Sequence, residues 1–167
     1  MPQSVRANRA FLARVARFLA GEAGIRQFLD IGTGIPSADN THEVAQTLDF
    51  GQPVAIMLIA IMYCIPDEDD PYGIAARLVD ALPPGSFLAL SHPARDLNAQ
   101  TRAQMSTRVN AMLKTPVTLR DRAQVARFFD GVELIDPGVV VVPEWRPVSE
   151  LEARSPAWVW GGVGRKR

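Results

Sequence analysis

The chain has 167 residues, of which 47% are hydrophobic and 22% are charged. These shares are ordinary for a globular protein and exclude wholesale disorder and fibrous repeats. The length allows one domain with a hydrophobic core, so we expect a single domain over residues 1–167. Lysine plus arginine and aspartate plus glutamate both number 18. This balance provides no field that favours a nucleic acid or an anionic membrane as partner.

The single cysteine and the longest apolar run bear on the compartment. Cys64 cannot form an internal disulfide, and it lies in an apolar segment, so we expect a buried thiol without a redox role. The apolar run 54–65 has about a dozen residues, whereas a membrane-spanning helix needs about 20. No charged leader followed by an apolar core opens the sequence. We therefore expect a cytoplasmic protein that is neither secreted nor inserted in a membrane.

Two patterns begin the domain. Apolar residues at helical spacing over 5–20, with arginines on the other side, predict an amphipathic helix. Residues 27–31 are short and apolar and are followed at once by Gly32-Thr33-Gly34. This order predicts a buried strand that ends in a glycine turn.

Capping signals mark the next helices. Asn40 with Glu43 has the spacing of a capping box and predicts a helix through residue 46. The run 54–61 is apolar without alternation, as expected for a central parallel strand covered on both faces. Asp70 before Pro71 predicts the start of another helix, with proline at its first position.

The second half continues the alternation of strands and helices. Residues 86–91 predict a buried strand, and residues 99–113 and 121–129 predict helices. Asp121 with Gln124 repeats the capping pattern. The alternation predicts a layered α/β domain whose end is antiparallel. Strand pieces are expected at 131–134, 139–142 and 157–160, the last one ending before Gly161-Gly162.

The glycine turn is the segment with the clearest chemistry. A strand ending in Asp30-Ile31-Gly32-Thr33-Gly34 lets a ligand approach the backbone, and a following helix start offers free N–H groups. Glycines after a strand are also ordinary turn residues, and this alternative stays open. Pro36 stands where a dinucleotide fingerprint has its third glycine, and no Gly-Lys-Ser/Thr follows. NAD and P-loop sites are therefore not favoured.

A wider resemblance rests on several segments. Residues 28–36 and 40–46 resemble a family of actinobacterial S-adenosylmethionine (SAM)-dependent methyltransferases that was formerly a domain of unknown function. The resemblance implies a class I, Rossmann-like α/β fold, here reduced, with a mostly parallel sheet and an antiparallel C-terminal strand. Further segments are similar to the family in the same order, at 65–74, 82–86, 91–92, 125–131 and 161–165.

The same resemblance implies SAM as a small-molecule cofactor, held by the glycine turn and by the segment after the next strand. His92 follows an expected strand end, where ligands of open α/β sheets collect, and is our candidate for substrate binding; a loop histidine without function is the alternative. No catalytic residue is assigned, and with two histidines in the chain we expect no metal cluster. The implied cofactor-binding residues are Asp30, Gly32, Thr33, Gly34, Asn40, Ala60, Ile61, Met62 and Tyr63.

Relative to the family, the chain passes almost directly from Gln46 to Leu48, an omission of about 60 to 80 residues, or two strand–helix units. A Tyr-Asp-Tyr-Leu-Leu-Gly-Gly-like N-terminal motif is also absent. In the family the omitted stretch supplies the ribose and adenine contacts. Its loss would make 27–31 an edge strand open to pairing, which predicts a homo-oligomer. Two hypotheses follow: a truncated methyltransferase-like protein of unknown acceptor, and a non-catalytic remnant that acts as an interaction module.

Overall fold

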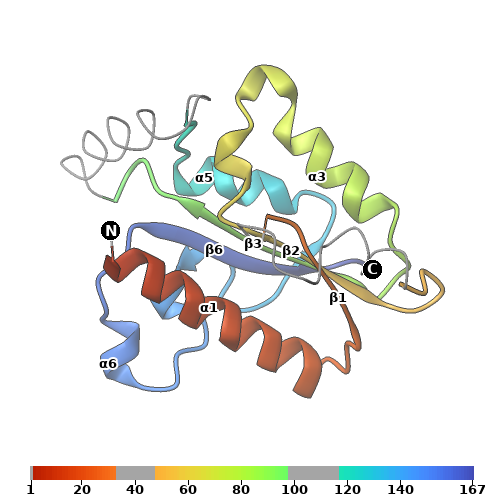
Figure 1. Cartoon of the computed structure of the whole chain (residues 1–167), viewed down its shortest axis with the longest axis horizontal. Helices are drawn as coiled ribbons and strands as arrows, with labels where there is room; N and C mark the ends of the chain where they lie inside the picture. Colours follow the sequence, from red (N-terminus) through yellow and green to blue (C-terminus); the bar gives the residue numbers. More distant parts are fainter. Residues whose placement is uncertain (1, 33–47, 98–116) are drawn as a thin grey trace.

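The computed structural model describes residues 2–32, 48–97 and 117–167, which form one sheet covered by helices on both faces (Figure 1). The sheet has the order β1-β2-β3-β6-β4, and β5 also pairs with β6. Strands β1, β2 and β3 are parallel, and β6 runs antiparallel to β3, β4 and β5. The expected α/β fold with an antiparallel end is therefore confirmed. The strands are β1 (Gln27–Asp30), β2 (Val54–Ile59), β3 (Phe87–Pro93), β4 (Glu133–Leu134), β5 (Val140–Val141) and β6 (Val159–Arg165).

The helices form a layer on each side of the sheet. Helices α3 and α5 lie on one face, and α1 and α6 lie on the other (Figure 1). α5 continues as a 3₁₀ turn over Arg127–Phe129. Further 3₁₀ turns occur at Met62–Cys64, Asp67–Asp69 and Val142–Glu144. The helices are α1 (Pro2–Gly21), α3 (Pro71–Asp80), α5 (Arg122–Ala126) and α6 (Glu150–Ala153).

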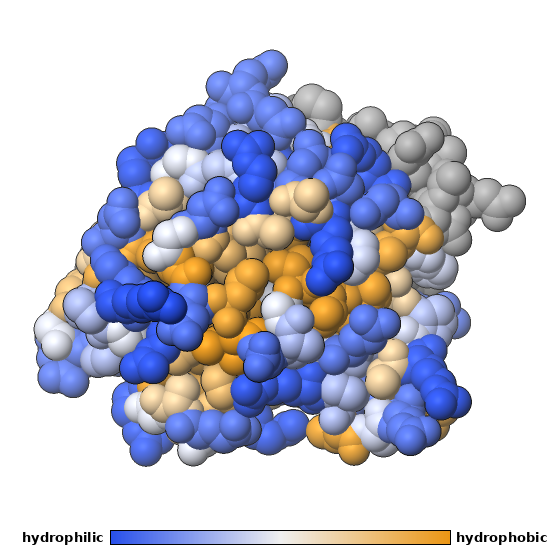
Figure 2. Space-filling view, turned by 180° about the vertical axis from the view of Figure 1, so that it is seen from behind, coloured by the Kyte–Doolittle hydropathy of each residue, from blue (hydrophilic) through white to orange (hydrophobic). Residues whose placement is uncertain are grey.

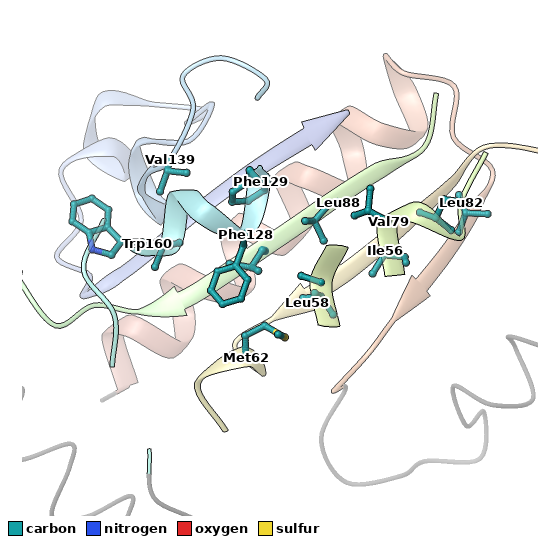
Figure 3. Packing of buried hydrophobic residues seen from close by; sticks show 14 of the residues in the cluster. Ile56, Leu58, Met62, Val79, Leu82, Leu88, Phe128, Phe129, Val139 and Trp160 are labelled. Atoms are coloured by element: carbon teal, nitrogen blue, oxygen red, sulfur yellow. The ribbon is translucent and has the colours of Figure 1, made fainter. Parts of the chain in front are cut away.

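Each face of the sheet has its own hydrophobic core, because successive side chains of a strand point to opposite faces. Ile56 and Leu58 of β2 pack with α3 and with Phe128 and Phe129 on one side (Figure 3). Ala55 and Met57 of the same strand belong to the cluster around α1 on the other side. The uninterrupted apolar sequence of β2 is thus explained by burial on both faces.

Strand β1 lies at the edge of the sheet formed by the described residues, as the sequence predicts. Its first residue also fixes the chain that leads into β2. The Gln27 side-chain amide donates to the Asp49 carbonyl (2.9 Å) and accepts from the Asp49 N–H (2.6 Å). These two bonds resemble a backbone bridge and hold the entry to β2 beside the start of β1.

Strand β6 runs through the glycines where the sequence predicts its end. The expected strand 157–160 is in fact Val159–Arg165. A Cβ on Gly164 would lie 2.5 Å from Val132 Cγ2, and a Cβ on Gly161 would lie 2.7 Å from Val142 Cγ1. The glycines therefore let neighbouring segments approach both faces of a strand that continues, rather than ending it.

Local capping signals predicted the starts of α3 and α5 well, whereas α6, which begins after Ser149, was not predicted. The Asp70 side chain accepts from the Gly73 N–H (2.9 Å), and Asp121 and Gln124 form both bonds of a capping box. The expected helices through residue 46 and over 99–113 lie outside the described residues. Cys64 is only partly buried, in a 3₁₀ turn, which corrects the expectation of a buried thiol. In the described part of the chain, no helix has the length and apolar character needed to cross a membrane.

Candidate functional site

The parallel strands bring their carboxyl ends to one edge of the sheet. Asp30 of β1 pairs with Met57 of β2, and Ile59 of β2 pairs with Ser91 of β3. The segments that follow β1 and β2 therefore leave the sheet beside each other. Thr33, Gly34 and Asn40 lie outside the described residues.

Gly32 contacts the segment after β2 directly. It has a φ of +94°, and a Cβ there would lie 2.8 Å from Ile61 Cγ1. A side chain at this position would thus be strained by the backbone and would also collide with Ile61. The Gly32 backbone itself is exposed. Two residues that the sequence placed in one cofactor site are therefore neighbours, at a surface where a ligand can approach the backbone.

Asp30 ends β1 just before this glycine. Its carboxyl is partly buried, and burial raises the pKa of Asp30 above its ordinary value. Ile31 follows it and donates its N–H to the Met57 carbonyl (2.9 Å). The backbone is therefore paired with β2 up to the residue before the turn.

The chain leaves β2 at a strained residue. Ala60 has a left-handed φ of +51°, a conformation that costs about 1 to 2 kcal/mol for a residue with a Cβ. Its N–H is held by both the carbonyl (3.0 Å) and the hydroxyl (3.1 Å) of Ser91 on β3. This buried serine, which the sequence did not single out, holds the backbone just before Ile61.

The next two predicted residues differ in role. The Met62 side chain is 2% exposed and lies in the core with Leu58 and Phe128 (Figure 3), so this side chain faces away from the surface. Tyr63 is partly buried, and its carbonyl accepts from the Thr118 N–H (2.9 Å). Burial is the main cause that raises the pKa of Tyr63.

The sequence predicts that His92 lies just after the end of a strand. In the structure it lies inside β3 and is 0% exposed. Its Nδ1 lies 2.9 Å from the Pro93 carbonyl, and its Nε2 lies 3.0 Å from Arg120 Nη1. Burial lowers the pKa of His92 to about 4; the Pro93 carbonyl opposes this shift and the Arg120 charge adds to it. Both ring nitrogens are engaged in this conformation. The location is therefore a correction, and substrate binding by His92 stays a prediction.

Sequence reasoning missed Arg120, which occupies the centre of this region. Its side chain is fully buried, lies 5.5 Å from the centroid of the Phe128 ring, and donates to the Met62 carbonyl (3.1 Å) and to Asp67 Oδ1 (2.6 Å). The sequence around it shows only an arginine before a helix cap, Asp121. No local signal identifies it, because its partners lie more than 25 residues away in the chain.

A cavity of about 870 Å³ lies elsewhere. It is lined by Phe18 at the end of α1, by Gln27 at the start of β1 and by Phe87 at the start of β3. It is thus at the amino ends of the parallel strands, away from the glycine turn. Ligands of open parallel sheets bind at the carboxyl ends, so the candidate site is the surface around Gly32 rather than this cavity.

Comparisons with known proteins place this geometry in a family. Two crystal structures align over most of the chain. A DUF574-family protein from Streptomyces avermitilis MA-4680 is 33% identical, with a TM-score of 0.88, and the alignment covers 100% of this chain and 85% of that one. A candidate methyltransferase from Thermobifida fusca YX is 27% identical, with a TM-score of 0.82 and coverage of 98% and 82%. No curated protein matches the chain.

The family comparison agrees with these structures. A sequence model described as S-adenosyl methyltransferase matches the chain in two segments, residues 1–48 and 45–167. The matched segments include the β1–glycine turn, the segment after β2, and both β3 and β6. The chain therefore belongs to the S-adenosyl methyltransferase family.

Proposed function

We propose that this chain binds SAM at the carboxyl ends of β1 and β2 and acts as a methyltransferase-like protein on an acceptor that remains to be identified. The observation that carries the proposal is the contact between Gly32 and Ile61, which leaves exposed backbone at the edge where ligands of parallel sheets bind. Family membership supports SAM as the ligand. When bound, SAM supplies a methyl group on a sulfonium sulfur for transfer to a nucleophile.

The residues of the chain would divide the work of binding. Gly32 lets the ligand reach the backbone, and Asp30, whose pKa is raised by burial, offers a carboxyl group beside it. Ala60 and Ile61 form the adjoining wall, whose backbone is held at Ala60 by Ser91. Thr33, Gly34 and Asn40 remain proposed contacts on the basis of the family resemblance, and His92 remains a proposed substrate contact. We assign no catalytic residue.

Calorimetric titration with SAM and S-adenosylhomocysteine tests the proposal. We expect saturable binding that Gly32→Arg abolishes, because the new side chain meets Ile61. Gly131→Ala is the matched control for Gly32→Ala: Gly131 also has a positive φ (+85°), but a Cβ there would meet nothing within 4 Å. Both alanine variants should lose stability because of the positive φ, Gly32→Ala more so because its Cβ also meets Ile61, and only Gly32→Ala should lose affinity. Absence of binding at millimolar SAM, equivalent to an affinity weaker than about −4 kcal/mol, would refute the proposal.

A second candidate function is that of an interaction module without catalysis. Two observations favour it: β1 lies at the edge of the described sheet, and Figure 2 shows hydrophobic side chains in the middle of one face, inside a hydrophilic rim. An internal truncation, expected from the family resemblance, is part of this second proposal. In a homo-oligomer formed through β1, the second copy would complete the pocket.

Light scattering over a range of protein concentrations separates these two functions when it is combined with the titration. A dimer that binds SAM supports a shared pocket, and a dimer that does not bind SAM supports the interaction module. A monomer at all concentrations contradicts pairing through β1.

A further inference from the structure

The guanidinium of Arg120 joins two parts of the site region. It is 0% exposed and donates to the carbonyls of Met62 (3.1 Å) and Ile65 (3.0 Å) and to Asp67 Oδ1 (2.6 Å). All three acceptors lie on the segment that follows β2. On the other side, Arg120 Nη1 lies 3.0 Å from Nε2 of His92 in β3.

The chemistry of these groups fixes the roles in the network. A guanidinium only donates, so Nε2 of His92 is the acceptor and the proton sits on Nδ1, which donates to the Pro93 carbonyl (2.9 Å). The arginine charge is balanced by Asp67, whose side chain is 59% exposed. The network therefore runs from a fully buried histidine to a carboxylate at the surface.

The segment after β2 depends on such contacts because it is irregular. Within residues 60–67, backbone bonds join Cys64 to Ile61 and Ile65 to Met62, both across a single 3₁₀ turn. Carbonyls buried without a partner would each cost about 1 to 3 kcal/mol. Arg120 donates to the Ile65 carbonyl and also to the Met62 carbonyl, which the Ile65 N–H reaches as well. It thereby ties the segment to β3, from which Ser91 holds Ala60.

We propose that Arg120 is a positioning residue of the SAM site: its guanidinium holds residues 60–67 against β3 and so keeps Ile61 in place against Gly32. The expected effect on SAM affinity rests on the proposed function. Its structural part, the fixed segment, can be measured without ligand. In this network His92 is the neutral hydrogen-bond acceptor that orients Arg120.

The first part of the test is amide hydrogen exchange on the ligand-free full chain. In Arg120→Ala we expect the amides of residues 61–65 and of Asp67 to exchange at least about tenfold faster, because the opening of this segment becomes easier. Asp67→Asn, at an exposed position, should show the same local change to a smaller degree, and it decides the matter alone if Arg120→Ala fails to fold. Arg14→Ala is the matched control, because Arg14 is also a buried arginine bound to backbone carbonyls, on the opposite face of the sheet.

The second part measures SAM binding by calorimetry in the same variants. We expect affinity to fall about tenfold or more in Arg120→Ala and to stay unchanged per folded molecule in Arg14→Ala. Arg120→Lys should not restore it, since an ammonium cannot reach all four acceptors as a fork does. Guanidinium chloride at low concentration should restore affinity in Arg120→Ala relative to sodium chloride of equal ionic strength.

The outcomes separate the two proposals. Unchanged exchange of residues 61–67 in the Arg120 and Asp67 variants would overturn the positioning role, and so would faster exchange with unchanged SAM affinity. If the wild-type chain binds no SAM, the proposed function fails, while the exchange experiment still decides whether Arg120 fixes this segment.

Discussion

Two buried arginines, Arg14 and Arg120, lie on opposite faces of the sheet, and both donate to backbone carbonyls of irregular segments. Arg14 of α1 donates to the carbonyls of Val142 and Trp145 and pairs with Glu152. Arg120 likewise binds two carbonyls and one carboxylate, and it alone of the two also contacts a histidine, His92. In both places an irregular segment buries carbonyls that a distant guanidinium satisfies.

The two networks differ in what lies next to them. The partners of Arg14 belong to the 3₁₀ turn after β5 and to α6, and they close the layer against α1. Apart from His92, the partners of Arg120 belong to the segment that contacts Gly32. The same interaction thus stabilises a packing layer in one place and shapes the candidate site in the other, so mutations should separate stability from binding.

The largest expected effect is on stability, in Arg14→Ala and Arg120→Ala. Each variant removes a buried guanidinium that donates to two backbone carbonyls and one carboxylate, and we expect each to lose about 3 kcal/mol of unfolding free energy. Urea unfolding measures this loss. A loss of SAM affinity in Arg14→Ala would contradict the difference between the two networks. Full stability in either variant would contradict their similarity.

The next largest expected effect is a pH dependence of stability caused by His92, on the Arg120 side of the sheet. Because the pKa of folded His92 is about 4 and its ordinary value is 6.5, the unfolded chain binds a proton in this window and the folded chain does not. Stability should therefore fall as pH drops from 6.5 to 4, by up to about 3 kcal/mol, and this part of the loss should level off below pH 4. Urea unfolding at several pH values measures it.

Two variants isolate the histidine contribution from that of the carboxylates. His92→Gln should flatten the curve between pH 4 and 6.5, and Arg14→Ala should leave its slope unchanged. An identical slope in wild type and His92→Gln would show that another group is responsible.

Glycines of β6 test how tightly each layer packs. Gly164→Ala places a Cβ 2.5 Å from Val132, on the α5 side, and Gly161→Ala places one 2.7 Å from Val142, on the α1 side. We expect each to lose about 1 to 3 kcal/mol by overpacking. Thermal unfolding measures both. A stabilised variant would mean that the neighbouring segment on that face can move away.

The smallest effects are expected at two helix caps. Asp121 begins α5 with a complete capping box, and the bond donated by the Gln124 N–H is the main cause that lowers the pKa of Asp121. Asp121→Ala should cost about 1 kcal/mol. Ser149→Ala, at the exposed four-residue α6, should cost only about 0.5 kcal/mol. Denaturant midpoints measure the two losses, and equal losses would contradict the stronger role given to the capping box.

Interactions within a few residues explain which parts of the fold were predictable. The strands at Val54 and Phe87, the glycine at the end of β1 and the capping box at Asp121 all follow from short patterns. Their neighbours in the chain fix their conformation, so the sequence window contains the cause.

The remaining features depend on partners that are distant in the chain. Arg120 is buried because Met62, Asp67 and His92 surround it, and His92 is buried because β3 continues past Ser91 to pair with β6. Likewise, β6 continues through its glycines because other segments pack on them. None of these causes is visible in a local window of the sequence. The position of Gly32 at the carboxyl edge of the sheet, in contrast, was predictable from the strand directly before it.

The side-chain clamp between Gln27 and Asp49 has an evolutionary consequence. It fixes the point at which the chain returns to the sheet, independently of the path taken between β1 and β2. Closing a loop costs only about 0.6 kcal/mol more for each doubling of its length. The stretch between these strands can therefore gain or lose whole units over evolutionary time while the pairing of β1 with β2 is preserved.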